Sequence, residues 1–171
     1  MTIYFADGTS QATAGEGKVV QVVYAIKDDT SSITVGSQYD GNLWSGPSIT
    51  MSNSSNKVLI LGSITLGLSS EQRADIKLYR GSTAIALGNA SGSRYRATGA
   101  TNSYVCYYAA DASISHLDSP GSGTHQYKIY GHCGAGGSGR TIYMNRTGCD
   151  VNNGEYARYS SSLVLMEISN S

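Results

Sequence analysis

Charged side chains are scarce in this sequence, and those present cancel. Asp, Glu, Lys and Arg make up 14% of the 171 residues, with 12 basic residues against 12 acidic ones. Proteins that bind nucleic acid concentrate Lys and Arg in a basic surface, so this balance argues against a nucleic-acid partner. A surface poor in charge and rich in Ser, Thr and Tyr suits contacts with other proteins or with glycans.

Long apolar segments are also missing. No stretch approaches the roughly 18 apolar residues of a membrane span. The start, Met1 to Asp7, has neither the basic residues nor the apolar core of a signal peptide. We therefore expect a soluble chain, made in the cytoplasm, with no membrane partner.

Cysteine is rare and its count is odd. Cys106, Cys133 and Cys149 cannot form a complete disulfide framework. A chain without a secretion signal meets a reducing compartment, so free thiols are favoured over a disulfide. Whether Cys133 and Cys149 pair is left open.

Proline and phenylalanine are nearly absent, whereas glycine and tyrosine are abundant: 2 Pro and 1 Phe stand against 21 Gly and 13 Tyr. Abundant β-formers and turn residues with few helix formers predict an all-β chain. Turn signals recur roughly every 8–15 residues and separate short strands. The pattern predicts one antiparallel β-sandwich or jelly roll over residues 18–171, after an irregular arm or lead over residues 1–17.

The clearest strand signal covers residues 57–68. Apolar side chains recur there at period two, with Gly62 in phase: Val58, Ile60, Ile64, Leu66 and Leu68. A Gly-, Asn- and Ser-rich loop carrying Trp44 and Pro47 is expected before it. The other expected strands are 18–27, 32–35, 76–79, 84–87, 104–108, 125–132, 140–147 and the closing run 160–169.

The closing run is apolar on both faces. Side chains alternate across a strand, so Val164, Met166 and Ile168 face one way and Leu163 and Leu165 the other. An antiparallel strand with one wet face alternates apolar and polar residues instead. This strand therefore needs cover on both sides, and the second cover could be a partner subunit.

Catalytic, metal and cofactor motifs are not found. Gly134 to Thr141 resembles a phosphate loop faintly, but Arg140 replaces the Lys and a strand is expected where a helix should begin. His132, Cys133 and Cys149 match no zinc spacing. No Gly-x-Ser-x-Gly elbow occurs, and the carboxylates are scattered. We predict no catalytic residue, no metal site and no cofactor, although sequence alone does not exclude a converging acid pair of a hydrolase.

Aromatic residues give the most suggestive pattern. Eight tyrosines cluster in the second half of the chain, which fits either a binding interface or ordinary filling of amphipathic strands. We predict Tyr108, Tyr143, Leu163 and Leu165 as subunit-interface residues. The single Trp44 either stacks on a sugar ring, making it a candidate glycan contact, or plugs the end of the core.

Four stretches together resemble a known family: Lys57–Ile64, Asp75–Ser82, Leu117–Pro120 ahead of Tyr127–Ile129, and Ser161–Ile168. They are similar to jelly-roll domains of tailed-phage virion proteins, especially from phages of marine bacteria and cyanobacteria. Such domains occur in tail fibres, head fibres and capsid decoration proteins, and share the topology of the trimeric tumour-necrosis-factor and C1q jelly rolls. The resemblance covers roughly residues 18–169.

The resemblance implies a non-enzymatic homotrimer located in the virion, with the inner sheets of three protomers meeting on the axis. Its partners would be sister copies and other capsid or tail proteins. The short lead favours a compact knob, such as a decoration protein or short fibre tip, over a long fibre. The alternative function is a tail-fibre module that binds a host-receptor glycan. A depolymerase is the third hypothesis, supported by no motif.

Overall fold

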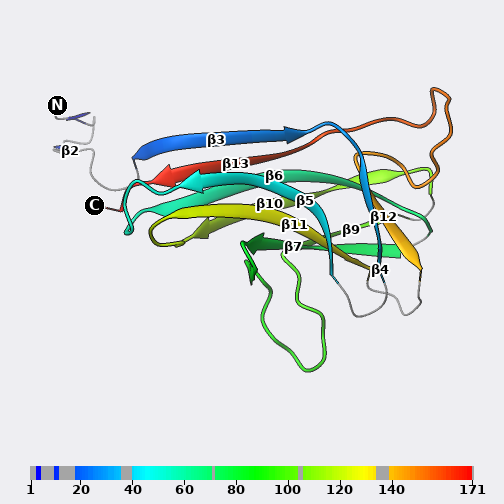
Figure 1. Cartoon of the computed structure of the whole chain (residues 1–171), viewed down its shortest axis with the longest axis horizontal. Helices are drawn as coiled ribbons and strands as arrows, with labels where there is room; N and C mark the ends of the chain where they lie inside the picture. Colours follow the sequence, from blue (N-terminus) through cyan, green and yellow to red (C-terminus); the bar gives the residue numbers. More distant parts are fainter. Residues whose placement is uncertain are drawn as a thin grey trace.

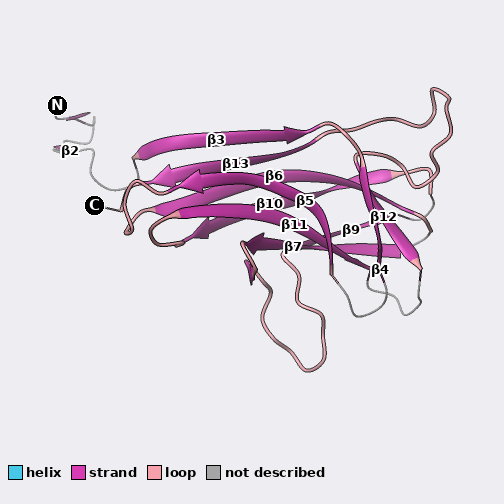
Figure 2. Cartoon of the chain, viewed as in Figure 1, coloured by secondary structure: helices cyan, strands magenta, loops and turns pink. Residues whose placement is uncertain are grey.

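The computed structural model describes residues 3–4, 10–11, 18–35, 40–70, 72–103, 106–133 and 139–170, and every regular element in these residues is a strand (Figures 1 and 2). No helix within them is long and apolar enough to cross a membrane. The strands are β1 (Ile3–Tyr4), β2 (Ser10–Gln11), β3 (Val19–Lys27), β4 (Ser31–Val35), β5 (Gly41–Thr50), β6 (Lys57–Leu68), β7 (Gln72–Arg80), β8 (Thr83–Ile85), β9 (Gly99–Ser103), β10 (Ala109–Asp118), β11 (Thr124–Cys133), β12 (Arg140–Met144) and β13 (Ser161–Ile168).

Two antiparallel sheets form the sandwich. In the first sheet β13 lies between β3 and β6, and β10 pairs with the other edge of β6. β12 pairs with the last residues of β6 and, on its other edge, with β4. In the second sheet β11 lies between β5 and β7, and β7 carries β8 and β9. Successive strands alternate between the sheets along much of the chain, which is the topology of a jelly roll. The all-β sandwich prediction is confirmed.

The lead contains a small separate sheet. β1 and β2 pair antiparallel through Ile3 with Gln11 and Tyr4 with Ser10. The rest of residues 1–17 lies outside the described residues, so the predicted arm stays a prediction.

The core lies between the sheets and follows the period-two pattern. Val58, Ile60, Ile64, Leu66 and Leu68 of β6 are all buried, as the sequence predicted. They meet the buried residues of the second sheet, among them Ile76, Leu78, Tyr127 and Ile129. Gly62 is in phase with this row but only half-buried, and the Leu163 side chain occupies the space where a Cβ would sit.

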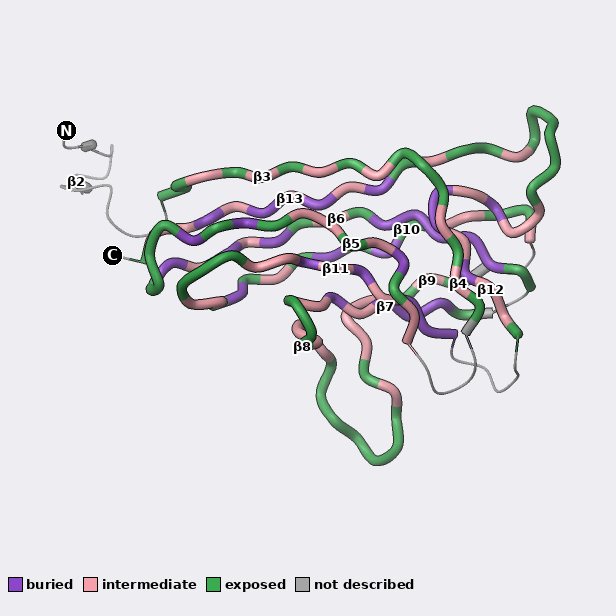
Figure 3. Tube along the Cα trace, in the orientation of Figure 1, coloured by how far each residue is buried: buried purple, intermediate pink, exposed green. Residues whose placement is uncertain are grey.

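The closing run forms strand β13, as predicted, whereas the cover predicted for its second face stays a prediction. Its residues alternate strictly: Ser161, Leu163, Leu165 and Glu167 are buried, and the residues between them are half-buried (Figure 3). The alternation arises because β3 and β6 flank the strand while only one of its faces meets the second sheet.

Two predicted elements are corrected, and strands β9 and β10 were not predicted. The expected loop with Trp44 is strand β5, whose pattern is hidden by register shifts against β11 near Gly46 and Pro47. The expected strand 104–108 has a turn at Cys106 and Tyr107, and residues 104–105 lie outside the described residues. The buried side chains of β10 are Ala112, Ile114 and Asp118, a mixture of small, large apolar and charged residues that gives no clear period-two apolar signal.

Candidate functional site

The outward face of the first sheet carries apolar side chains on four strands, most of them on β3, β13 and β6. In one row Tyr24, Val164, Leu61 and Ser115 lie side by side, and in the next Val22, Met166, Leu59 and Leu117. Tyr24 is 61% exposed, Val22 55% and Leu117 49%. We call this surface the outer apolar face; its residues are Val22, Tyr24, Ile26, Leu59, Leu61, Leu117, Val164 and Met166.

The outward face of the second sheet differs sharply. Thr50 and Thr124 pair there through their hydroxyls at 2.8 Å. Lys77 and Lys128 are also outward on β7 and β11, next to the tilted rings of Tyr79 and Tyr130. One sheet thus presents a polar face to water and the other an apolar one. Exposed contiguous apolar patches on soluble proteins mark interaction sites.

The predicted interface residues are partly misplaced. Leu163 and Leu165 are fully buried in the core of the single chain, so a partner cannot reach them without opening the sandwich. The alternate residues, Val164 and Met166, point outward instead. Tyr143 in β12 lies under the guanidinium of Arg146, 3.7 Å from its ring centroid. Tyr108 is 64% exposed, but at one end of the sandwich rather than on the outer apolar face.

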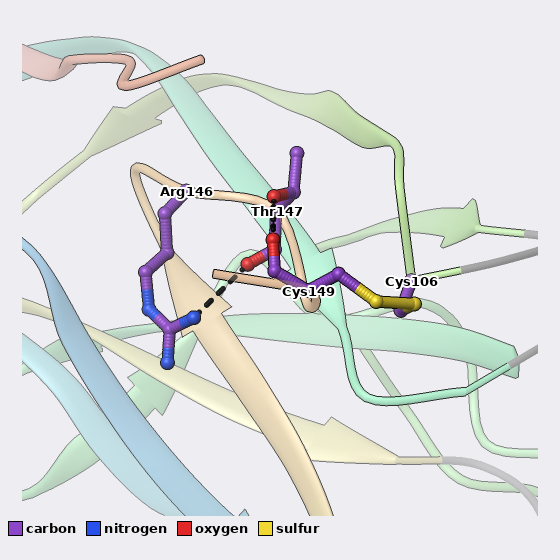
Figure 4. The surroundings of a disulfide bond; sticks show 4 residues. All are labelled: Cys106, Arg146, Thr147 and Cys149. Carbon is purple, nitrogen blue, oxygen red and sulfur yellow. Dashed lines mark hydrogen bonds between the residues drawn. A yellow bond between two sulfur atoms is a disulfide. The ribbon is translucent and has the colours of Figure 1, made fainter. Parts of the chain in front are cut away.

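That end is tied by a disulfide between Cys106 and Cys149, whose Cα atoms are 5.0 Å apart (Figure 4). The expectation of free thiols is therefore wrong for these two residues. Pairing of Cys133 with Cys149 is excluded too, because Cys133 is a buried free thiol. Sequence could not reveal the pair because 43 residues separate its members.

The segment leading to Cys149 is packed tightly against β6. Thr147 donates its hydroxyl to the Cys149 carbonyl at 2.6 Å, and Arg146 donates to the Thr147 carbonyl at 3.2 Å (Figure 4). A Cβ on Gly148 would overlap the Leu68 carbonyl, and one on Gly67 would overlap the Arg146 carbonyl. Both positions therefore need glycine.

Four tyrosines gather beside the disulfide. Tyr107 and Tyr156 have ring centroids 5.8 Å apart, with planes tilted by 50°. Together with Tyr108, Tyr159 and Glu155 they line a hollow of about 480 Å³, which we call the tyrosine hollow. A second hollow of about 400 Å³ shares Tyr156 with it and is otherwise lined by Arg158 and residues 150–153. Sequence reasoning grouped these tyrosines by composition but could not place them together.

Trp44 does not line the tyrosine hollow. It lies in β5 opposite Ile129, is half-buried, and packs against the hydrophobic core. Its position matches the alternative of a core plug, and the glycan contact expected at Trp44 finds no support in its placement.

A polar cluster joins the loop after β8 to the second sheet. Asp40 accepts hydrogen bonds from Lys77 at 2.9 Å, from Tyr79 at 3.2 Å and from Tyr95. Burial opposes ionisation of Asp40, but these three donors hold its pKa below the usual value. Tyr95 also stacks on His132, with centroids 3.7 Å apart. The cluster fixes Tyr95, and with it this loop, to the sheet.

Metal ligands do not converge in the described part of the chain: it holds no group of three or more His, Cys, Asp or Glu side chains that suits an ion. Burial raises the pKa of the Cys133 thiol to about 11, which disfavours the reactive thiolate. Most of the glycine loop before Arg140 lies outside the described residues, and Arg140 begins strand β12.

No protein-family profile matches the chain, and no curated protein matches it. Among solved structures it is similar to a chain in a structure of infectious bursal disease virus, Gx strain, with a TM-score of 0.45 and 11% sequence identity. The match covers 96% of this chain and 41% of that chain, so this chain spans less than half of its length.

Proposed function

We propose that this protein is a non-enzymatic structural protein of a phage virion, which forms a homotrimer through its outer apolar face. It acts by protein–protein binding, as a capsid decoration protein or a short fibre or tail component. The observation that carries the proposal is the contrast between the two sheets: one outward face is polar, and the other exposes apolar side chains over four strands.

Sister copies are the occupant that best fits this face. Its cross-strand rows place apolar side chains such as Tyr24 and Val164 next to one another, and the face carries few charged groups that a differently charged partner could recognise. When every copy uses the same kind of face, a closed ring buries all of them at once.

Solution mass tests the assembly. Sedimentation equilibrium at about 10 µM, well above the dissociation constant of a stable oligomer, should give three times the chain mass of 18.0 kDa. Val164→Glu should reduce the mass to that of one chain, because a carboxylate would then be buried without a partner. Val164 points outward, so the variant keeps the fold.

Thr83→Glu is the matched control, since Thr83 is exposed in β8 of the other sheet. It should leave the oligomer mass unchanged. A wild-type protein that sediments as a single chain at this concentration overturns the trimer.

The virion location needs a separate test. Mass spectrometry of purified particles should detect the chain at a fixed ratio to the major coat protein, and density in an electron cryomicroscopy map should accommodate the trimer. Absence of the chain from purified particles contradicts the virion assignment, whatever its oligomeric state.

A further inference from the structure

We propose that the tyrosine hollow is a binding site for a neutral glycan. The hollow is distinct from the outer apolar face and lies beside the Cys106–Cys149 disulfide. The inference does not depend on the trimer: a monomer can bind sugar there, and a trimer can form without it.

The aromatic surface is the first reason. Tyr107 is 54% exposed and Tyr108 64%, and both come from the turn before β10. Tyr156 and Tyr159 approach from the segment after the disulfide. A sugar ring has an apolar face of C–H groups, and rigid tyrosine rings offer a large amphipathic surface to stack on at little cost in conformational entropy.

The polar rim is the second reason. Glu155 lies at the edge of the tyrosine hollow, and the adjoining hollow carries Asp150, Asn152, Asn153 and Arg158. Carboxylate, amide and guanidinium groups together can both accept from and donate to sugar hydroxyls. Each hollow is within the volume range of small-ligand sites, and they share Tyr156, so two adjacent sugar units fit the arrangement better than one.

The charge pattern selects neutral sugars. Arg158 lies 2.5 Å from Asp150 and Arg146 lies 3.6 Å from it, so both guanidinium groups face the same carboxylate. Glu155 stands at the rim of the tyrosine hollow. An acidic sugar would therefore meet a like charge where it has to stack.

The site is preorganised by its supports. The Cys149 amide donates to the Cys106 carbonyl at 2.8 Å, and the Tyr159 amide donates to the Asn145 carbonyl at 3.0 Å. Asn145 is buried and donates to the Lys27 and Asp29 carbonyls at 2.8 and 2.9 Å. Loops fixed in this way lose little freedom on binding, which favours affinity.

Titration with defined sugars tests the inference. The probes are the methyl glycosides of glucose, galactose, mannose and N-acetylglucosamine, and that of N-acetylneuraminic acid as the acidic comparison. In ¹H–¹⁵N NMR spectra, at least one neutral glycoside should shift the amides of residues 106–109 and 149–160, and the acidic one should not. Tyr107→Ala should weaken binding about tenfold, whereas Tyr107→Phe, which keeps the ring, should stay within about threefold.

Tyr24→Ala is the matched control, because Tyr24 is similarly exposed but lies on the outer apolar face. It should change the oligomer mass and leave the affinity for the monovalent glycoside unchanged. The inference is overturned if no neutral glycoside shifts these amides at about 20 mM, the weak end of single-sugar affinities. It is overturned equally if Tyr107→Ala binds as well as the wild type.

Discussion

Glu167 is a carboxylate buried inside the sandwich, on the core-facing side of β13. It accepts hydrogen bonds from Gln21 at 2.5 Å, from Asn56 at 2.7 Å, and from the amide and hydroxyl of Ser52 at 2.9 and 2.7 Å. Burial opposes ionisation, but these donors prevail and lower the pKa of Glu167 to about 2. The residue thus fastens the turn before β6 to the closing strand.

Replacing Glu167 by Gln should destabilise the protein by about 1–3 kcal/mol at neutral pH, because the donors around it lose a charged acceptor. The folded pKa lies below the usual 4.5, so the wild-type carboxylate stabilises the fold above that pH. This contribution is lost as the pH falls from about 4.5 to 2. Urea unfolding across this range should show a smaller pH dependence for Glu167→Gln than for the wild type. The exposed Glu155→Gln should leave that dependence unchanged.

Asp118 is a second buried carboxylate with dedicated donors. Arg80 donates to both of its oxygens at 2.7 and 2.8 Å, and the buried Tyr127 hydroxyl donates at 2.8 Å. Tyr127→Phe removes one donor and should cost about 1–2 kcal/mol. Asp118→Ala leaves Arg80 and the Tyr127 hydroxyl without their acceptor, and should cost more. Equal losses in urea unfolding would contradict this account.

At the scale of elements, the segment 145–160 forms no strand and is positioned by a disulfide, by close packing of a glycine and by a single antiparallel bridge between Arg146 and Arg158. The disulfide closes a loop across 43 residues, and Gly148 lies directly against the end of β6. The same segment carries two of the four tyrosines of the hollow. Its order is therefore a condition for the proposed glycan site.

Replacing both Cys106 and Cys149 by Ser should lower the free energy of unfolding by up to about 4 kcal/mol, from the loop-closure entropy of the unfolded chain. Binding of the neutral glycoside should weaken as well, since the turn carrying Tyr107 loses its tether. Thermal unfolding and NMR titration measure the two effects. Cys133→Ser, a change at the buried free thiol, should leave glycoside binding unaltered.

At the scale of the whole molecule, the outward face of the second sheet is polar, whereas the first sheet presents the outer apolar face. Association through the apolar face is driven by removing hydrocarbon from water, not by charge pairing. Raising the salt concentration to about 1 M, where surface charges are screened within about 3 Å, should therefore leave the trimer intact. Sedimentation at low and high salt measures this, and dissociation at high salt would indicate an electrostatic interface instead.

Strong period-two patterns let sequence alone identify much of the fold. β6, β11 and β13 were predicted within a few residues, because large apolar side chains at alternate positions occur in few other settings. β5 and β10 were missed. A bulge interrupts the alternation of apolar and polar residues in β5, and small or polar side chains such as Ala112 and Asp118 weaken that alternation in β10. The candidate interface was harder to predict than the fold. Leu163 and Leu165 were predicted as interface residues, but their side chains face the core.

The sequence by itself determined the all-β class, the apolar side chains on both faces of the closing strand, and the balanced charge. These are local or summed properties, which the order of residues along the chain contains directly. Only the tertiary structure decided which side of β13 meets the core, that Cys106 pairs with Cys149, and that four tyrosines share one hollow. Those facts depend on how strands distant in sequence are paired, and a period-two pattern is the same whichever of its faces turns inward.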